Sequence, residues 1–529
     1  MKNNGVIRLV SLIFVLAVVV FGGCRKVTVT QEEIRAFIED YEQSAEFLDR
    51  QEASNRWQFV VTGYSDSLEH YRDLAAAFAT RIEWYSQSQK YAGLIEDKNL
   101  LAKLELIRRR SIRGIIDRSP AVARLMDSLT AVFRQFQPVF ESKPDTVARL
   151  EQVLASDSNR FRRQDAWMAL AALGEQTAGG VTQLMKLRNR AAARIGFNSY
   201  YDLMLSADGL DKSEYLGWLR EWDRLSAEPY RRALDSVARD LGGENLRPWD
   251  IDFARGNLNP VEYYPVEQQV PRLKSTLMGI GFNLDKWPIY FANGAIPAED
   301  PSGGVIKVHI PDDIRVATAL AAGPEPLGKL LSQAGRALYA AHINQNDFLL
   351  AQPPAPCFEW GMGKMMKGLA ALDAWKLKYA AIPEPTIIEA AARRRFMLLH
   401  DLRLMLVHLS FEYEMYKNPT NDLHQVYREL FERYMMFPYP EKVKDWAVQL
   451  DYIVNPVGMQ NRLVGAGIAA QVYHYLMEKN GAVLDQPQTG EFLANSLWRS
   501  GGAQTWQDLL LQVTGEKFNP RYLMEYPGL

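Results

Sequence analysis

Apolar residues recur at helical spacing along most of the chain. In the stretch EEIRAFIEDYEQSAEFLDRQ, the residues Ile34, Phe37, Ile38 and Tyr41 follow one another at short intervals, and spacings of three and four mark one face of an α-helix. The same period runs through YRDLAAAFATRIEWYSQSQKY, EYLGWLREWDRLSAEPYRRALDSVARDL and RRRFMLLHDLRLMLVHLSFEYEMY. This pattern predicts a body that is helical nearly throughout.

One segment carries the best strand signal. In GGVIKVHI, residues 303–310, the pattern alternates around Val305, Lys307 and His309 between Gly and Pro breakers. The chain shows no repeat of fixed period and no low-complexity tract, which argues against a solenoid. We therefore expect an all-α fold with at most a very small β element near 303–310.

The first residues, MKNNGVIRLVSLIFVLAVVVFGGCRK, differ from the rest of the chain. Lys2 and Arg8 make the region before an almost wholly apolar run at 9–21 positive, and small residues then lead directly to Cys24. This order is typical of an export signal, and it resembles a bacterial lipoprotein signal in which Cys24 becomes the lipidated first residue. A signal anchor that stays in the membrane is the alternative.

The predicted division of the chain follows from this segment. We expect a lipoprotein signal peptide at 1–23, a lipidated Cys24 with a short tether at 24–30, and one helical domain at 31–529. This arrangement predicts a membrane attachment through the lipid on Cys24 at the bacterial cell envelope. Arg25 stands where an Asp would favour retention at the inner membrane, so we expect the outer membrane or a periplasm-facing location.

Composition narrows the class of partner. The 529 residues are 47% hydrophobic and 23% charged, which is enough apolar material for a large packed core. The formal net charge is -2 and the chain has no long basic run, so there is no electrostatic reason to expect nucleic acid as a partner.

The segment LLSQAGRALY, at 330–339, has the frame of a zinc-peptidase helix. In such helices two His at i and i+4 bind zinc from one face, and a Glu between them acts as the base on the bound water. The corresponding five positions here read Ser332, Gln333, Ala334, Gly335 and Arg336. Neither imidazole is present.

Further segments, in order along the chain, carry a family resemblance. They include FIEDYEQSAEFL, EASNRW, LMKLRNRAAARIGFNSYYDLML, RPWD, HIPDDIRVATAL, FEYEMYKNPTNDL, DWAVQLDYIVNPVGMQNRLVGAGIAAQVYHYL and TWQDLLLQVTGEKFNPRYL. Together they resemble the angiotensin-converting enzyme family of peptidyl-dipeptidases, especially its bacterial members, which share an architecture with thimet-type oligopeptidases. The resemblance implies a zincin-like, elongated, two-lobed helical body with a deep central cleft sized for short peptides.

The resemblance also implies where the zinc site has been lost. The first His falls on Ser332, the catalytic Glu on Gln333, the second His on Arg336, and the third ligand, a Glu, on Trp360. An Arg and a His of the bacterial pattern fall on Ala351 and Ala355, and the window 450–460, where the family has a His and a Tyr, offers only Tyr452.

These substitutions predict a protein without a zinc cofactor. A structural zinc site is worth about 10–16 kcal/mol when its ligands are complete, whereas a fixed cation about 4 Å from a dication repels it by roughly 8 kcal/mol at an effective dielectric near 20. We therefore expect the Arg336 guanidinium to occupy the metal volume and to pair with a nearby carboxylate or carbonyl.

Four residues are candidates to contact a ligand in this cleft, and they are Arg336, Glu359, Trp360 and Gln460. Arg336 suits an anionic group such as a peptide C-terminal carboxylate. For Trp360 there are two interpretations, a large side chain that fills an apolar void or a ring that stacks on a bound ligand.

Other chemistries find little support in the sequence. His400 and His408 lie about 12 Å apart along one predicted helix and are interpreted as satisfied core or surface histidines. Cys357 has no His nearby in sequence and is interpreted as an inert buried thiol. The tetrapeptide GMGK, at 361–364, lacks the spacing of a phosphate loop.

The sequence therefore favours a catalytically inactive peptidyl-dipeptidase homologue, a pseudopeptidase that binds a peptide or an envelope protein. The first alternative is an active metallopeptidase or changed hydrolase with ligands of a non-standard kind. The second is a structural envelope subunit whose cleft has filled in.

Overall fold

The computed structural model describes residues 29–528 apart from residues 118, 244, 257, 259 and 295–302. The signal peptide, Cys24 and all but the last two residues of the tether therefore lie outside the described residues. Helices hold 71% of the residues and strands 4%, so the fold is all-α with a small β component, as the periodicity predicts. No helix within the described part of the chain is long and apolar enough to cross a membrane.

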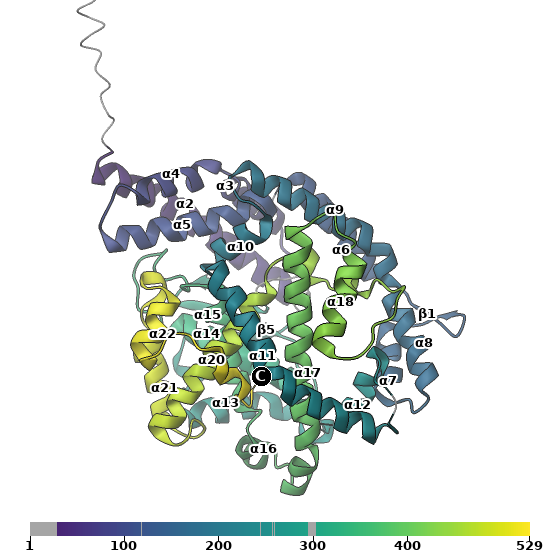
Figure 1. The fold of residues 1–529 in the computed structure, drawn as a ribbon. Coiled ribbons are helices and arrows are strands. Elements are labelled where there is room, and N and C mark those ends of the chain that lie inside the picture. The colour runs from purple at the N-terminus through teal and green to yellow at the C-terminus, as the bar shows by residue number, and fades with distance from the viewer. Residues whose placement is uncertain are drawn as a thin grey trace, which may run out of the picture.

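Four helices form the N-terminal layer, which lies along the upper edge of Figure 1. The first begins where Thr30 accepts a hydrogen bond from the Glu33 amide and Glu33 bonds back to the Thr30 amide, a capping box that satisfies two free donors. It ends at Gly63, whose φ of 76° suits glycine. The layer comprises α2 (Gln31–Thr62), α3 (Leu68–Ala79), α4 (Ile82–Ala92) and α5 (Lys98–Asp117).

The middle of the chain continues with helices and a two-residue hairpin. Its elements are α6 (Pro120–Gln135), β1 (Val139–Phe140), β2 (Lys143–Pro144), α7 (Val147–Ser156), α8 (Arg160–Ala171), α9 (Leu173–Arg194), α10 (Tyr200–Asp208), α11 (Lys212–Asp240), α12 (Ile251–Arg255) and α13 (Gln269–Gly279).

A three-stranded sheet follows. Its strands are β3 (Ile289–Asn293), β4 (Val305–His309) and β5 (Asp313–Thr318), in the order β3-β5-β4, with β3 parallel and β4 antiparallel to β5. The strand expected near 303–310 is confirmed as β4. The other two strands were not predicted, because β3 does not alternate and the polar–apolar alternation of β5 is confined to Asp313–Val316.

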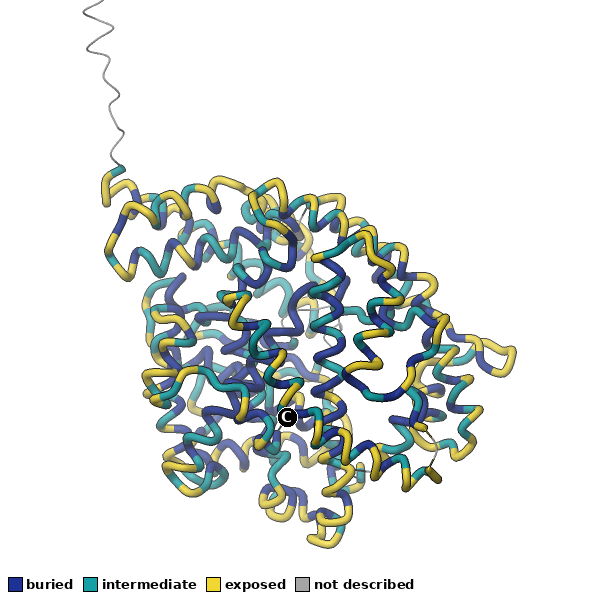
Figure 2. Tube along the Cα trace, viewed as in Figure 1, coloured by how far each residue is buried: buried dark blue, intermediate teal, exposed yellow. Residues whose placement is uncertain are grey.

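The C-terminal half supplies the helices of the centre. They are α14 (Pro324–Ala341), α15 (Pro356–Leu369), α16 (Asp373–Tyr379), α17 (Glu384–Lys417), α18 (Leu423–Met435), α19 (Asp451–Val454), α20 (Met459–Asn480), α21 (Pro487–Phe492) and α22 (Trp506–Thr514). In Figure 2 the buried part of the tube is concentrated in the middle of the molecule and the exposed part along its rim.

Glycines allow α15 to approach two neighbouring helices closely. A Cβ at Gly335 of α14 would lie 2.7 Å from the Met362 carbonyl oxygen, and a Cβ at Gly465 of α20 would lie 2.7 Å from the Cys357 carbonyl oxygen. Backbones can pack this closely only where the side chain is absent. The three helices therefore fix the relative positions of residues 336, 359 and 360.

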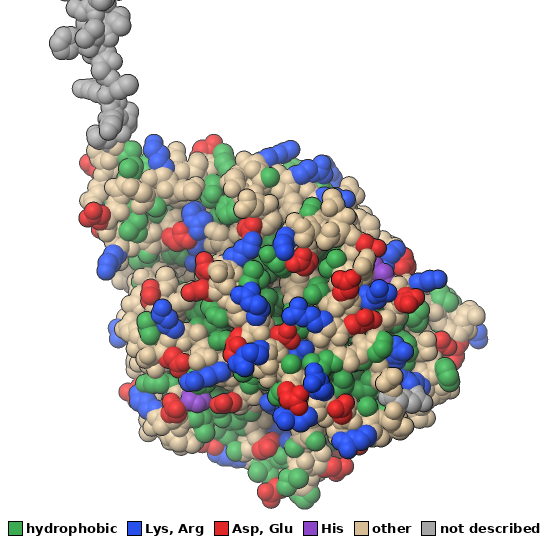
Figure 3. All heavy atoms as spheres, in the orientation of Figure 1, with side chains coloured by type: hydrophobic (Ala, Val, Ile, Leu, Met, Phe, Trp, Pro, Cys, Tyr) green, Lys and Arg blue, Asp and Glu red, His purple; other side chains and the backbone are tan. Residues whose placement is uncertain are grey.

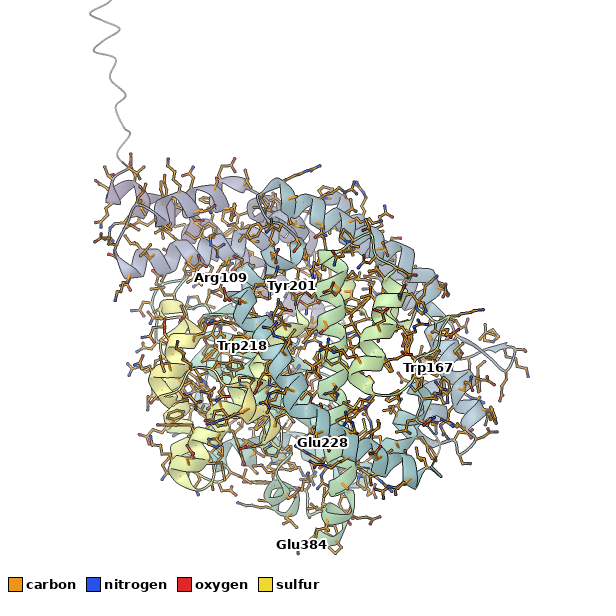
Figure 4. The ribbon with its side chains drawn as sticks, viewed as in Figure 1. Arg109, Trp167, Tyr201, Trp218, Glu228 and Glu384 are labelled. Carbon is orange, nitrogen blue, oxygen red and sulfur yellow. The ribbon has the colours of Figure 1, made fainter. Side chains whose placement is uncertain are left out.

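The buried apolar residues form one large cluster and three smaller ones within the described residues. The N-terminal layer has its own small cluster, which includes Ile38 and Trp84 together with Leu349 and Leu350. Arg109 of α5, labelled in Figure 4, ties this layer to the body, because it donates to the carbonyl oxygens of Ala207 at 2.9 Å and Pro354 at 2.7 Å.

Candidate functional site

A cavity of about 540 Å³ lies beside the degenerate zinc-site positions. Its walls come from α2, from β4 and the turn after it, from the segment at 345–352 and from α14 and α15. Arg336, Glu359 and Trp360 all line it. The cavity therefore lies against the helices that the sequence analysis singled out.

Three charged residues meet at this cavity. Arg336 donates from Nε at 3.1 Å and from Nη2 at 2.9 Å to one carboxylate oxygen of Glu359, and Lys307 Nζ donates at 2.8 Å to the other. The side chains of Arg336 and Glu359 are only 7% and 10% exposed. Arg336 thus pairs with a carboxylate, as expected.

Glu359 is held in its ionised form. Burial alone would raise the pKa of its carboxyl, but the charges and hydrogen bonds of Lys307 and Arg336 outweigh burial and lower the pKa to about 2. The three side chains together carry one net positive charge at neutral pH.

The indole of Trp360 lies between two guanidinium groups. The Cζ of Arg336 is 4.6 Å from the ring centroid and that of Arg462 is 5.5 Å from it, both within cation–π range. Arg462 in turn pairs with both carboxylate oxygens of Asp451, each at 3.0 Å. Trp360 is half-buried. Two of its neighbours are charged guanidinium groups, whereas one interpretation expected an apolar void.

The other two degenerate positions have structural contacts. The Gln333 side chain is 2% exposed, and its amide donates to the carbonyl oxygens of Gly303 at 2.9 Å and Ala317 at 3.1 Å. Ser332 faces α15, because a Cβ at Gly363 would lie 2.6 Å from the Ser332 hydroxyl oxygen. Gln333 therefore links α14 to β5 of the sheet by a hydrogen bond.

These residues do not fit the zinc ion that the resemblance implies. Zinc in proteins is bound by thiolate, imidazole and carboxylate groups, whereas the four positions offer a hydroxyl, an amide already bonded to two carbonyl oxygens, a guanidinium and an indole. The carboxylate of Glu359, which pairs with Arg336, already accepts hydrogen bonds from two cations. Within the described residues, no three His, Cys, Asp or Glu side chains come together as a metal site.

The structure places Gln460, the fourth residue expected to contact a ligand, outside this cavity. Its side chain is 0% exposed, and its amide donates to Asp208 at 2.9 Å. Asn461 donates to the same carboxylate oxygen at 2.6 Å, and Arg113 pairs with the other one. A buried carboxylate needs such partners, so Gln460 belongs to this network and does not line the cavity.

The remaining residues of the sequence analysis lie in the core. His400 bonds to the Tyr230 hydroxyl at 3.2 Å and His408 to the Tyr452 hydroxyl at 3.0 Å, which confirms them as satisfied histidines. Cys357 is 0% exposed, and burial raises the pKa of its thiol far above the ordinary value. The tetrapeptide GMGK falls within α15.

The cavity wall also carries acidic side chains, among them Glu46, Glu52 and Asp312. Glu46 and Glu52 pair with Arg50 and Arg56, two arginines of the same wall. His309 lies between Glu46 and Asp312, with ring nitrogens 3.8 Å and 3.2 Å from their carboxylates. The cavity therefore offers charges of both signs to a ligand.

Lys307 is the residue of this site that sequence reasoning missed. It stands in the predicted strand, but no local pattern indicates that this strand packs beside residue 359. Comparison of the chain with protein-family models and with curated proteins gives no match. The family likeness therefore stays a prediction that depends on the sequence segments quoted above.

Proposed function

We propose that this protein is a pseudopeptidase, a non-catalytic homologue of the peptidyl-dipeptidases that binds a peptide or a peptide segment of an envelope protein in the 540 Å³ cavity. The observation that carries this proposal is the Lys307–Glu359–Arg336 cluster. In this cluster Arg336, which stands at a position that the resemblance aligns with a zinc ligand, pairs with a carboxylate that Lys307 also contacts. Ligand cavities in proteins span about 300–1,000 Å³, so a short peptide is a suitable occupant.

The cluster is poorly suited to hydrolysis. A general base works best with a pKa near the working pH, whereas the carboxyl of Glu359 has a pKa of about 2. Arg336 stays protonated and accepts no proton. Neither side chain supplies what a bound water would need to become a nucleophile.

The same cluster is well suited to binding. Its net positive charge attracts a carboxylate, and guanidinium and ammonium groups form strong charge-assisted hydrogen bonds with one. The largely exposed carboxylate of Asp312 in the cavity wall complements an amino group or a basic side chain. In addition, β4 is an outer strand of its sheet and lines the cavity, and such strands offer main-chain groups to an extended peptide.

The open cavity favours binding over the structural alternative, in which the cleft has filled in. Over the face drawn in Figure 3, basic and acidic side chains are interspersed, and the net charge of -2 gives no reason to propose a nucleic-acid partner.

The proposal includes attachment to the bacterial envelope through a lipid on Cys24. Its support is the sequence order of a basic start, an apolar run and small residues before Cys24. Labelled palmitate should enter the wild-type chain in bacterial cells and should not enter a Cys24→Ala variant. Equal labelling of both chains would contradict the lipid site.

The binding proposal is tested with one set of fluorescent tetrapeptides. Each peptide is prepared with a free and with an amidated C-terminus, and its affinity is measured by fluorescence polarisation. We expect a free C-terminus to bind about tenfold more tightly, since hydrogen bonds to charged groups contribute about 1.5–3 kcal/mol. Lys307→Met should weaken binding of the free acid, whereas Lys442→Met, which changes an exposed lysine outside the cavity, should not.

Mass spectrometry of the same mixtures tests the absence of cleavage, and elemental analysis measures zinc. Intact peptides after long incubation are expected. Cleavage together with one zinc per chain would overturn the proposal in favour of a metallopeptidase with different ligands. Equal affinity for free and amidated peptides would refute the role of the cationic cluster.

A further inference from the structure

A second and larger cavity, of about 850 Å³, lies elsewhere in the molecule. It is enclosed by the start of α14, the end of α15, α16, α17 and the C-terminal residues 525–528. It shares no lining residue with the peptide cavity. Much of its wall is apolar, with Leu258, Leu372, Met397 and Leu398 among its residues.

The charged residues of this wall are mostly paired with one another. Among the described residues, six cations and four carboxylates line the cavity. Lys367 pairs with Glu325 at 3.0 Å, while Lys376 and Arg394 share Asp373 at 3.1 Å and 3.3 Å. Arg395 donates to the Met524 carbonyl oxygen at 3.0 Å, and Arg255 lies 4.0 Å from Asp401.

Lys364 is the sixth cation and the exception. It is half-buried in the cavity wall, and no hydrogen bond or ion pair links its ammonium group to any of the described residues. Burial and, to a lesser degree, the positive charges of Lys367 and Arg462 lower its pKa to about 8, against smaller opposing effects of Glu325 and Asp401. The potential around the amine is therefore positive, and an anion placed there would relieve it.

We propose that this cavity binds a small organic anion with an apolar body, such as an arylacetate, whose carboxylate contacts Lys364. The proposal stands on the unpaired amine, the surplus of cations over carboxylates in the wall, and the apolar surface beside them. It is independent of the peptide site, because the two cavities are built from different residues.

The test compares 1-naphthaleneacetate with its neutral isostere 1-naphthaleneacetamide by equilibrium dialysis against the full-length chain. All variants are kept in one detergent buffer, so that uptake by micelles cancels. We expect the acid to bind about tenfold or more tightly than the amide. Lys364→Met should remove that preference and leave binding of the amide unchanged.

Two further variants locate the site. Lys329→Met changes an exposed lysine of α14 outside the cavity and should leave both affinities unchanged. Ala391→Trp places a large ring at an exposed residue of the cavity wall and should weaken binding of the acid and the amide alike.

Three results would each overturn the proposal. They are the absence of saturable binding of the acid at millimolar concentration, equal affinities of the wild-type chain for acid and amide, and an unchanged acid affinity in Ala391→Trp. The comparison of acid with amide needs only the wild-type chain, so it decides the question even where Lys364→Met does not fold.

Discussion

Replacing Glu359 by Gln tests how strongly the ion cluster holds the centre of the molecule. The substitution keeps the shape of the side chain but leaves Lys307 and Arg336 facing a neutral amide. Holding the pKa of Glu359 at about 2 instead of 4.5 corresponds to about 3 kcal/mol, at about 1.4 kcal/mol for each pKa unit. Breaking a buried ion pair from one side costs about 3–5 kcal/mol, so the two magnitudes agree.

Urea unfolding at pH 7, followed by tryptophan fluorescence, measures this loss. Glu359→Gln should lower the free energy of unfolding by about 3 kcal/mol. The matched control is Glu221→Gln, which breaks an exposed pair with Arg224 at 2.6 Å and should cost less than about 1 kcal/mol. Replacing Lys307, Arg336 and Glu359 together by Met should recover much of the loss, because no buried charge is then left without a partner.

The pH dependence gives a second check with a definite sign. The folded pKa of Glu359 lies below its unfolded value, so its contribution is complete above pH 4.5 and is lost as the pH falls toward 2. The difference between wild type and Glu359→Gln should shrink over that window. A loss below about 1 kcal/mol at pH 7, or a difference that stays constant down to the acid limit, would refute the reasoning.

Three further predictions concern the core. Gly465→Ala should lower the free energy of unfolding by about 1–3 kcal/mol, because the added Cβ would lie 2.7 Å from the Cys357 carbonyl oxygen. Gly217→Ala, whose added Cβ has its nearest neighbour 3.9 Å away, should raise the free energy of unfolding by about 0.5–1 kcal/mol. Urea midpoints in the reverse order would contradict this. Burial lowers the pKa of His400 to about 3 and of His408 to about 4, so the two rings should stay neutral in the native chain down to about those pH values. Their contribution to stability should decline as the pH falls from 6.5 toward the folded pKa values; ring-proton NMR midpoints near 6.5 in the native chain would contradict this. The buried thiol of Cys357 should resist iodoacetamide in the native chain and react in urea, as peptide mass spectrometry can show; equally fast labelling in both states would disprove its burial.

The helices could be predicted from the sequence because their signal is local. Ile34, Ile38 and Tyr41 are buried on one face of α2, as the period requires, and Thr30 and Glu33 mark its start. The strands β3 and β5 gave weaker signals, since β3 does not alternate and the alternation of β5 covers only Asp313 to Val316. Their position depends on pairing with each other and on packing of Ile314 and Val316 against α14.

The candidate site, too, could be predicted only in part from the sequence. The sequence indicated that Arg336 would find a carboxylate, because a buried guanidinium without a partner is too costly. It did not identify Lys307 as the second partner of Glu359, and it placed Gln460 near a ligand although that side chain bonds to Asp208 in the core. Both contacts join residues that are far apart along the chain.

The sequence by itself determined the helical periodicity of this protein and the chemical groups at positions 332, 333, 336 and 360, because these depend only on residue types and short spacings. Only the tertiary structure decided which charges meet. Lys307 and Glu359 are 52 positions apart, and they touch because β4 and α15 each pack beside α14. Whether a buried charge has a partner depends on such packing, which no local pattern encodes.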